Sequence, residues 1–147
     1  MKKKLIAIAV AALCLASCGA KEISVTEMAM ALKDNLTFSE ELTEVGEKVT
    51  EKRIGLDEED VMQCTAYKGT NAVADEVVVI KAKDAKKVND KVSEYLDKQI
   101  ESYKSYRPSE VPKLENAVLY TTGDTVIFCV SEDHDAAEKL INDYINK

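Results

Sequence analysis

The sequence predicts an α+β domain of two layers, in which a four-stranded antiparallel sheet carries helices on one face. Short apolar segments typical of strands occur in two pairs, each separated by a tight turn. Each pair precedes a segment whose apolar residues recur at helical spacing, and another such segment begins the domain, which gives the order α-ββα-ββα. Because each helix has one apolar stripe, we expect all of them to pack on the same side of the sheet.

The first expected helix begins after Ser24, which forms a capping box with Glu27. Its apolar residues share one helical face: Val25, Met28, Ala29, Leu32 and Leu36. Residues 37–60 are strongly acidic, and there the pattern predicts only a short helix around residues 39–45, followed by a loop. The alternating oxygen ligands around a glycine that a calcium loop requires are absent from this sequence.

Two strands and a long helix follow. We expect strands over residues 61–68 and 76–82, with a turn at residues 69–71. Asp84 caps the helix, and Arg107-Pro108 ends it because the residue before a proline disfavours helical geometry. The buried stripe of this helix comprises Val88, Val92, Tyr95, Leu96, Gln99, Ile100 and Tyr103.

A hairpin and a last helix complete the domain. The hairpin strands cover residues 117–121 and 125–131, and the last helix buries Ala137, Leu140, Ile141 and Tyr144. A shift of 49 residues aligns Asp84 with Asp133 and Tyr95 with Tyr144. We therefore expect the two ββα units to form an internal repeat.

The N-terminus has the pattern of a bacterial lipoprotein signal. Three lysines precede an apolar run of twelve residues, from Leu5 to Ala16, and small residues come before Cys18. The run is shorter than the roughly 20 residues that a membrane span needs. An ordinary secretory signal favours a small residue at the outer site before the cut, where this chain has Leu15.

These features predict how the chain is processed and where it is located. We expect cleavage of the signal peptide, residues 1–17, between Ser17 and Cys18, and a diacylglycerol group on Cys18. Two acyl chains anchor a protein stably, which would place it on the outer face of the plasma membrane. Residues 18–23 form a short tether, so a single domain over residues 24–147 would lie close to the bilayer.

Length and charge exclude some classes of function. Removing the signal leaves 130 residues, which suits one domain. The three signal lysines leave with it, so 17 basic residues face 27 acidic ones and the formal charge becomes −10. Such a chain is not a general nucleic-acid binder, because phosphate would be repelled.

Two cysteines remain in the expected domain, Cys64 and Cys129. An exported pair can form a disulfide. The alternative is a pair of buried thiols on separate strands, since free cysteine packs as a small hydrophobe. Spacing along the sequence leaves both predictions open.

Four local phrases resemble a family of uncharacterised Firmicutes lipoproteins, the domain of unknown function numbered 4358. The phrases are Ala74-Asp75-Glu76-Val77-Val78-Val79-Ile80, Tyr106-Arg107-Pro108, Leu114-Glu115-Asn116-Ala117, and Gly123 in the hairpin turn. The resemblance covers roughly residues 24–146. It implies a lipid-anchored extracytoplasmic protein of Gram-positive bacteria, and it carries no known activity.

The reactive residue types do not form a recognisable catalytic or metal site. His134, the only histidine, lies among acids that suit a helix N-terminus, and Cys129 lies in an expected strand, so the two do not suggest a nucleophile and its base. One histidine and two distant cysteines fit no metal-ligand spacing. We therefore expect neither a metal nor a cofactor.

Candidate binding residues come from three places. Glu76 opens the most apolar strand and marks either the rim of a ligand groove or an exposed strand start. Lys86 and Lys87 lie in the first turn of the long helix, where cations oppose the helix dipole, so they either touch anionic lipid or wall polymers or belong to a solvated face. Tyr106, beside Arg107, is a candidate for exposed recognition.

Taken together, these features favour a non-enzymatic interaction or ligand-binding module, held at the membrane by its lipid anchor. Its partner would be a protein or a small ligand of the cell envelope. One alternative is an inhibitor or immunity-type lipoprotein that binds a secreted protein through its acidic segment, residues 40–60. Another is a cell-envelope enzyme that uses carboxylates such as Glu76.

Overall fold

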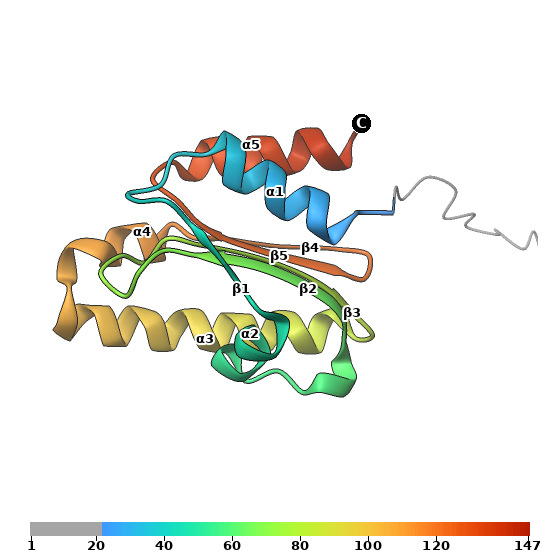
Figure 1. Cartoon of the computed structure of the whole chain (residues 1–147), viewed down its shortest axis with the longest axis horizontal. Helices are drawn as coiled ribbons and strands as arrows, with labels where there is room; N and C mark the ends of the chain where they lie inside the picture. The colour runs from blue at the N-terminus through green and yellow to red at the C-terminus, as the bar shows by residue number, and fades with distance from the viewer. Residues whose placement is uncertain (1–21) are drawn as a thin grey trace, which may run out of the picture.

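The computed structural model describes residues 22–147 (Figure 1). The predicted signal peptide, its cleavage site after Ser17 and the lipidated Cys18 lie outside the described residues. The described chain forms one five-stranded antiparallel sheet with strand order β1-β2-β3-β5-β4. The strands are β1 (Thr43–Val45), β2 (Val61–Lys68), β3 (Glu76–Ala82), β4 (Val118–Thr122) and β5 (Thr125–Val130).

Five helices cover the sheet. They are α1 (Val25–Asn35), α2 (Glu47–Ile54), α3 (Ala85–Tyr106), α4 (Val111–Glu115) and α5 (His134–Ile145). Two short 3₁₀ turns, Glu58–Asp60 and Pro108–Glu110, precede β2 and α4. In Figure 1, α1 and α5 lie above the sheet and α2 and α3 lie below it.

The α+β class and the antiparallel sheet are confirmed, but the placement of all helices on one face is wrong. One core, which contains Val77, Val79 and Ile127, packs against α1 and α5. A second core, which contains Ile80 and Phe128, packs against α2, α3 and α4. Because β3 and β5 are central and apolar at consecutive positions, both of their faces need cover, and the molecule has three layers.

The four-strand count is also wrong, and so is the helix expected around residues 39–45. Residues 43–45 form β1, which pairs with the end of β2, Val45 opposite Ala66. The helix of this segment is α2, which begins after Gly46 and ends at Gly55 with a left-handed backbone (φ 81°). A three-residue strand is too short to produce an alternating pattern, so the acidic surroundings concealed it.

The other elements lie close to their predicted positions. β2 and β3 have the expected bounds, and α3 runs from its Asp84 cap to Arg107. Ser24 caps α1 by accepting a hydrogen bond from the Glu27 backbone at 3.3 Å. The Glu27 carboxylate accepts a hydrogen bond from Tyr144 at 3.1 Å.

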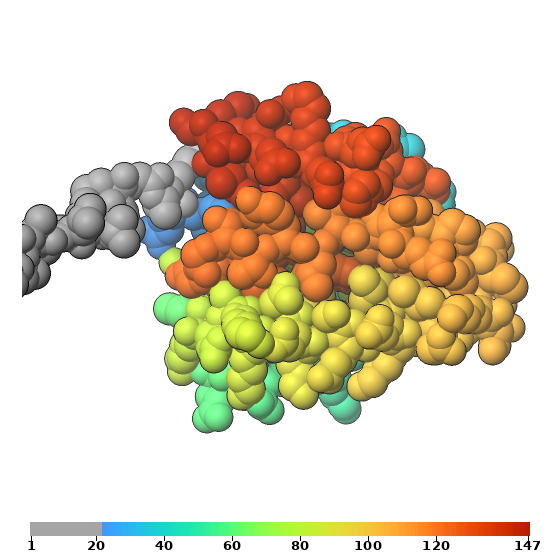
Figure 2. Space-filling model, turned by 180° about the vertical axis from the view of Figure 1, so that it is seen from behind, coloured from blue at the N-terminus to red at the C-terminus, as the bar shows by residue number. Residues whose placement is uncertain are grey.

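The proposed internal repeat holds only for the local order of elements. Asp84 and Asp133 both cap the helix that follows a strand. The aligned residues Val77 and Val126, however, belong to different cores and point to opposite faces of the sheet. The two helices therefore cover opposite faces, and Figure 2 shows the β4–β5 hairpin between α3 and α5.

The outer edge of β2 is covered in two ways. β1 pairs only with residues 66–68 of this strand. Before that stretch, the Glu47 carboxylate accepts a hydrogen bond from the Cys64 backbone at 2.9 Å. The side chain at the start of α2 thus satisfies a strand donor that β1 does not reach.

Candidate functional site

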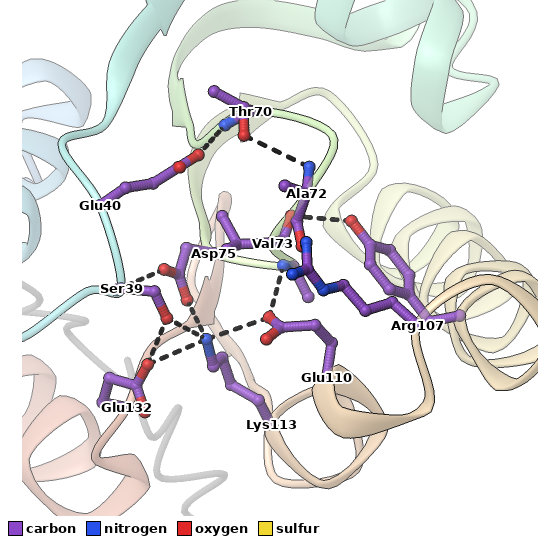
Figure 3. A network of polar contacts seen from close by, with 12 residues as sticks. Ser39, Glu40, Thr70, Ala72, Val73, Asp75, Arg107, Glu110, Lys113 and Glu132 are labelled. Atoms are coloured by element: carbon purple, nitrogen blue, oxygen red, sulfur yellow. Dashed lines mark hydrogen bonds and ion pairs between the residues drawn. The ribbon is translucent and has the colours of Figure 1, made fainter.

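The loop between β2 and β3, residues 69–75, is held by the C-terminal end of α3. Three side chains donate hydrogen bonds to backbone carbonyls of the loop: Tyr103 to Val73 (2.7 Å), Tyr106 to Asn71 (3.0 Å) and Arg107 to Ala72 (2.7 Å). Figure 3 shows Arg107 reaching across to this loop. The loop therefore has a fixed position beside α3.

A buried ionic network holds the other side of the loop (Figure 3). Asp75 is fully buried and accepts hydrogen bonds from the Lys113 ammonium at 2.8 Å and the Ser39 backbone at 2.6 Å. Lys113 also contacts Glu110 at 3.1 Å and Glu132 at 3.0 Å. Burial pushes the pKa of Lys113 down, but the hydrogen bonds that its ammonium donates to these three carboxylates outweigh burial and raise the pKa.

Two further carboxylates bind the loop backbone. Glu110 accepts from Ala74 at 2.8 Å, and Glu40 accepts from Thr70. The hydrogen bonds from Thr70 lower the pKa of Glu40. Part of the acidic segment therefore serves the fold as an acceptor for backbone donors.

A groove opens between this loop, α2 and α3. Its walls include Arg53, Lys68, Asn71, Gln99, Tyr103 and Tyr106. The cavity volume is about 260 Å³. That is below the roughly 300–1,000 Å³ typical of sites for drug-sized ligands, so the groove suits a small one.

A triad of Arg53, Glu76 and Tyr95 lies at the groove, which Arg53 and Tyr95 line. Glu76 is only 3% exposed, and its two oxygens accept hydrogen bonds from Arg53 and, at 2.9 Å, from the Tyr95 hydroxyl. Arg53 also donates to that hydroxyl at 2.7 Å. Burial, followed by the Glu76 charge, raises the pKa of Tyr95. Glu76 is therefore neither an exposed strand start nor a free rim residue, because the end of α2 brings a guanidinium to it.

The two cations of the groove differ in their partners, because Arg53 is paired with Glu76 and Lys68 has no paired carboxylate among the described residues. The Nη1 atom of Arg53 is buried and has no hydrogen-bond partner among the described residues. Lys68 is half-buried, and no carboxylate in the described part of the chain lies within ion-pair distance of it. Burial lowers the pKa of Lys68, and the charge of Arg53 lowers it further against the opposing effect of Glu76. Among the residues that line the groove, Arg53 and Lys68 are cationic and none is acidic, and of these two cations only Arg53 has a carboxylate partner, Glu76.

A second hollow lies at the opposite end of β3. It has a volume of about 360 Å³ and is lined by Glu22, Lys81, Gly123 and Asp124 among others. Its cation, Lys81, is paired with Glu22 at 2.5 Å and lies 3.8 Å from Asp124. Because that charge is already balanced, we consider the groove beside α3 the better binding site.

The basic residues at the start of α3 are paired within the chain. Lys86 contacts Asp90 at 2.8 Å, and Lys87 contacts Asp57 at 3.1 Å and Asp60 at 2.5 Å. The hydrogen bonds that Lys87 donates to these two aspartates raise its pKa. Lys87 therefore connects α3 to the segment before β2, Lys86 is paired within α3, and neither offers a free cationic patch.

The two cysteines are free thiols, so the disulfide alternative is wrong. Cys64 on β2 packs with the core beneath α3, whereas Cys129 on β5 belongs to the core beneath α1 and α5. Burial raises the pKa of both thiols to about 12. The ring nitrogens of His134 contact Asn116 and Glu138, so this histidine does not pair with the Cys129 thiol.

Among residues 22–147, no three His, Cys, Asp or Glu side chains are grouped to hold a metal ion. No helix in this part of the chain has the length and apolar character of a membrane span.

The fold and groove define a small three-layer α+β domain with a basic, tyrosine-lined site at one end of its sheet. The chain belongs to the family described as Domain of unknown function (DUF4358), whose profile matches residues 34–131. The match runs from the end of α1 through β5 and includes the groove, the loop and α3. No curated protein and no solved structure matches the chain significantly.

Sequence reasoning identified Tyr106 and Glu76 but missed Arg53, which binds Glu76, and Lys68, which lines the groove with Tyr106. A usable signal was present, because the chain has only two arginines, and both Arg53 and Arg107 bind around the β2–β3 loop or its strand ends. An arginine that interrupts an acidic segment is a reason to search for a buried carboxylate.

Proposed function

We propose that this chain is a lipid-anchored, extracytoplasmic bacterial lipoprotein that binds a ligand or partner in the groove between α2, α3 and the β2–β3 loop. The observation that carries the binding proposal is Lys68, a desolvated and unpaired cation beside Arg53. The sequence pattern around Cys18 and the resemblance to Firmicutes lipoproteins support the anchor, the Gram-positive source and a place on the outer face of the plasma membrane.

The position of the groove suits this arrangement. Glu22, the first described residue, pairs with Lys81 near the end of β3, whereas Lys68 lies opposite Glu76 at its start. Five residue steps along a strand separate these positions by about 17 Å. In Figure 1 the described chain starts at the right and the β2–β3 loop lies at the left. A chain anchored just before Glu22 would hold the groove away from the bilayer.

We propose binding rather than catalysis because the reactive groups are engaged or buried. Both oxygens of Glu76 accept hydrogen bonds, and the Cys129 thiol is shielded from solvent. Two acids that the inhibitor alternative would use, Glu40 and Glu47, bind backbone donors of the same chain. Neither alternative therefore has as direct a structural argument as the groove.

Site-specific photo-crosslinking in intact cells tests the proposal. Tyr106, which is 61% exposed at the groove, is replaced by benzoylphenylalanine, and Tyr120 on β4, 36% exposed, is replaced in a matched control. We expect a recurrent adduct from position 106 and little from position 120, detected by mass spectrometry. Equal labelling at the two positions, or none at position 106, would contradict the proposal.

A further inference from the structure

The charge of the groove restricts what it can bind. Arg53 and Lys68 contribute two positive charges, and Glu76 contributes one negative charge. A cationic ligand would be repelled, and a neutral one would leave Lys68 without an ion-pair partner in a partly desolvated place. A ligand with two charges would reverse the imbalance rather than remove it, so a single negative charge fits best.

The donors present favour a delocalised anion. Lys68 offers a half-buried ammonium on the wall of the groove, and Arg53, whose side chain is 25% exposed, adds its guanidinium charge to the same wall. Carboxylates and phosphodiesters spread one charge over two oxygens and accept from both kinds of donor. Both therefore satisfy the groove by the same chemistry.

The other residues that line the groove indicate what the uncharged part of the ligand is like. The rings of Tyr103 and Tyr106 meet edge to face with centroids 5.8 Å apart, while their hydroxyls bind the β2–β3 loop. Tyr103 is buried, so the ring surface that remains for apolar contact with a ligand is that of Tyr106, which is 61% exposed. Gln99 and Ser102 line the same space, and neither side chain forms a hydrogen bond within the described residues. A ligand the size of one sugar, with several hydroxyl groups, matches these polar and aromatic wall residues and the cavity volume of about 260 Å³.

We propose that the groove selects small polyhydroxylated ligands that carry one delocalised negative charge, received by Lys68 and Arg53. This inference rests on the proposed binding function and specifies its ligand class. A uronic acid and a glycerol phosphodiester are two sources of such a charge.

Isothermal titration calorimetry on the full-length chain in nonionic detergent micelles tests the inference at constant ionic strength. The probes are sodium glucuronate, sodium dimethyl phosphate and neutral glucose. We expect glucuronate to bind at least about tenfold more tightly than glucose, because glucose lacks the charge. Tighter binding of glucuronate than of dimethyl phosphate would identify the acidic sugar as the source, and the reverse order would identify the phosphodiester.

Matched lysine variants assign the charge to its residue. Lys68→Met should weaken glucuronate about tenfold or more, whereas Lys98→Met, an equal charge change on the exposed face of α3, should leave binding unchanged. Because Lys68→Met removes an unpaired, desolvated charge, its unfolding temperature should stay equal or rise, so lost binding would not reflect misfolding.

Failure of this inference is distinguishable from failure of the proposed function. Equal binding of glucose and glucuronate, binding that survives Lys68→Met, or no binding of any probe would overturn the ligand class. A crosslinked adduct at position 106 would still support the groove as the binding site.

Discussion

Replacing Glu76 by glutamine should destabilise the domain strongly, because it leaves Arg53 without its counter-charge. The substitution keeps the shape of the side chain but removes the carboxylate that accepts from Arg53 and Tyr95. Breaking a buried ion pair by removing one partner costs about 3–5 kcal/mol. Arg53 is 25% exposed and can be partly hydrated, so we expect the free energy of unfolding to fall by about 2–3 kcal/mol.

Urea unfolding followed by circular dichroism measures this change. The midpoint should fall for Glu76→Gln, and it should stay within error for Glu59→Gln, a matched change at an exposed carboxylate. A double-mutant cycle with Arg53→Met then isolates the pair, and the double variant should lose less stability than the sum of the single variants. The reasoning about the triad would be refuted if the free energy of unfolding of Glu76→Gln lay within about 0.5 kcal/mol of the parent value, which is the range of an ordinary surface change.

Four other predictions address the anchor, the thiols and the ionic network. Cys18→Ser should abolish metabolic labelling with radioactive palmitate, and an unchanged label would remove the lipoprotein assignment. Cys64 and Cys129 should resist alkylation until the protein unfolds, and a reductant should leave the unfolding temperature unchanged. Rapid alkylation of the native protein would contradict the burial of the two thiols. Lys113→Met should lower the free energy of unfolding by about 3 kcal/mol in urea titrations, because three carboxylates lose their cation. Hydrogen bonds from Ser39 and Lys113 lower the pKa of Glu132 below its ordinary 4.5. The ionised Glu132 therefore stabilises the fold fully above pH 4.5, and this stabilisation disappears as the pH falls through the lowered pKa. The urea midpoint should decrease in that acidic range, and it should decrease less in Lys113→Met.

Local signals in the sequence predicted the elements whose cause is local. The Asp84 cap, the Arg107-Pro108 stop and the apolar stripe between them place α3 within a residue of its true bounds. The apolar segments of β2 and β3 are equally direct. These signals act over a few residues, so no tertiary information was needed.

Features that depend on long-range pairing were not predictable in the same way. Arg53 and Glu76 are 23 residues apart and meet only because α2 returns beneath the sheet. Asp75 and Lys113 are 38 residues apart, and neither position shows that its charge is buried. The second layer of helices is consistent with the consecutive apolar residues of β3, which indicate a strand covered on both faces. The prediction of helices on one face rested instead on the single apolar stripe of each helix.

The contact between Glu47 and the edge of β2 affects how copies of this protein can associate with one another. The lipid anchor proposed above would confine the protein to two dimensions and so raise the effective concentration of its copies toward one another. An open strand edge would then favour pairing between neighbouring molecules. By accepting the hydrogen bond of the Cys64 backbone, Glu47 occupies that donor and places a negative charge where a second strand would have to approach. Glu47→Ala should therefore increase self-association on lipid vesicles at high surface density while leaving the isolated molecule folded.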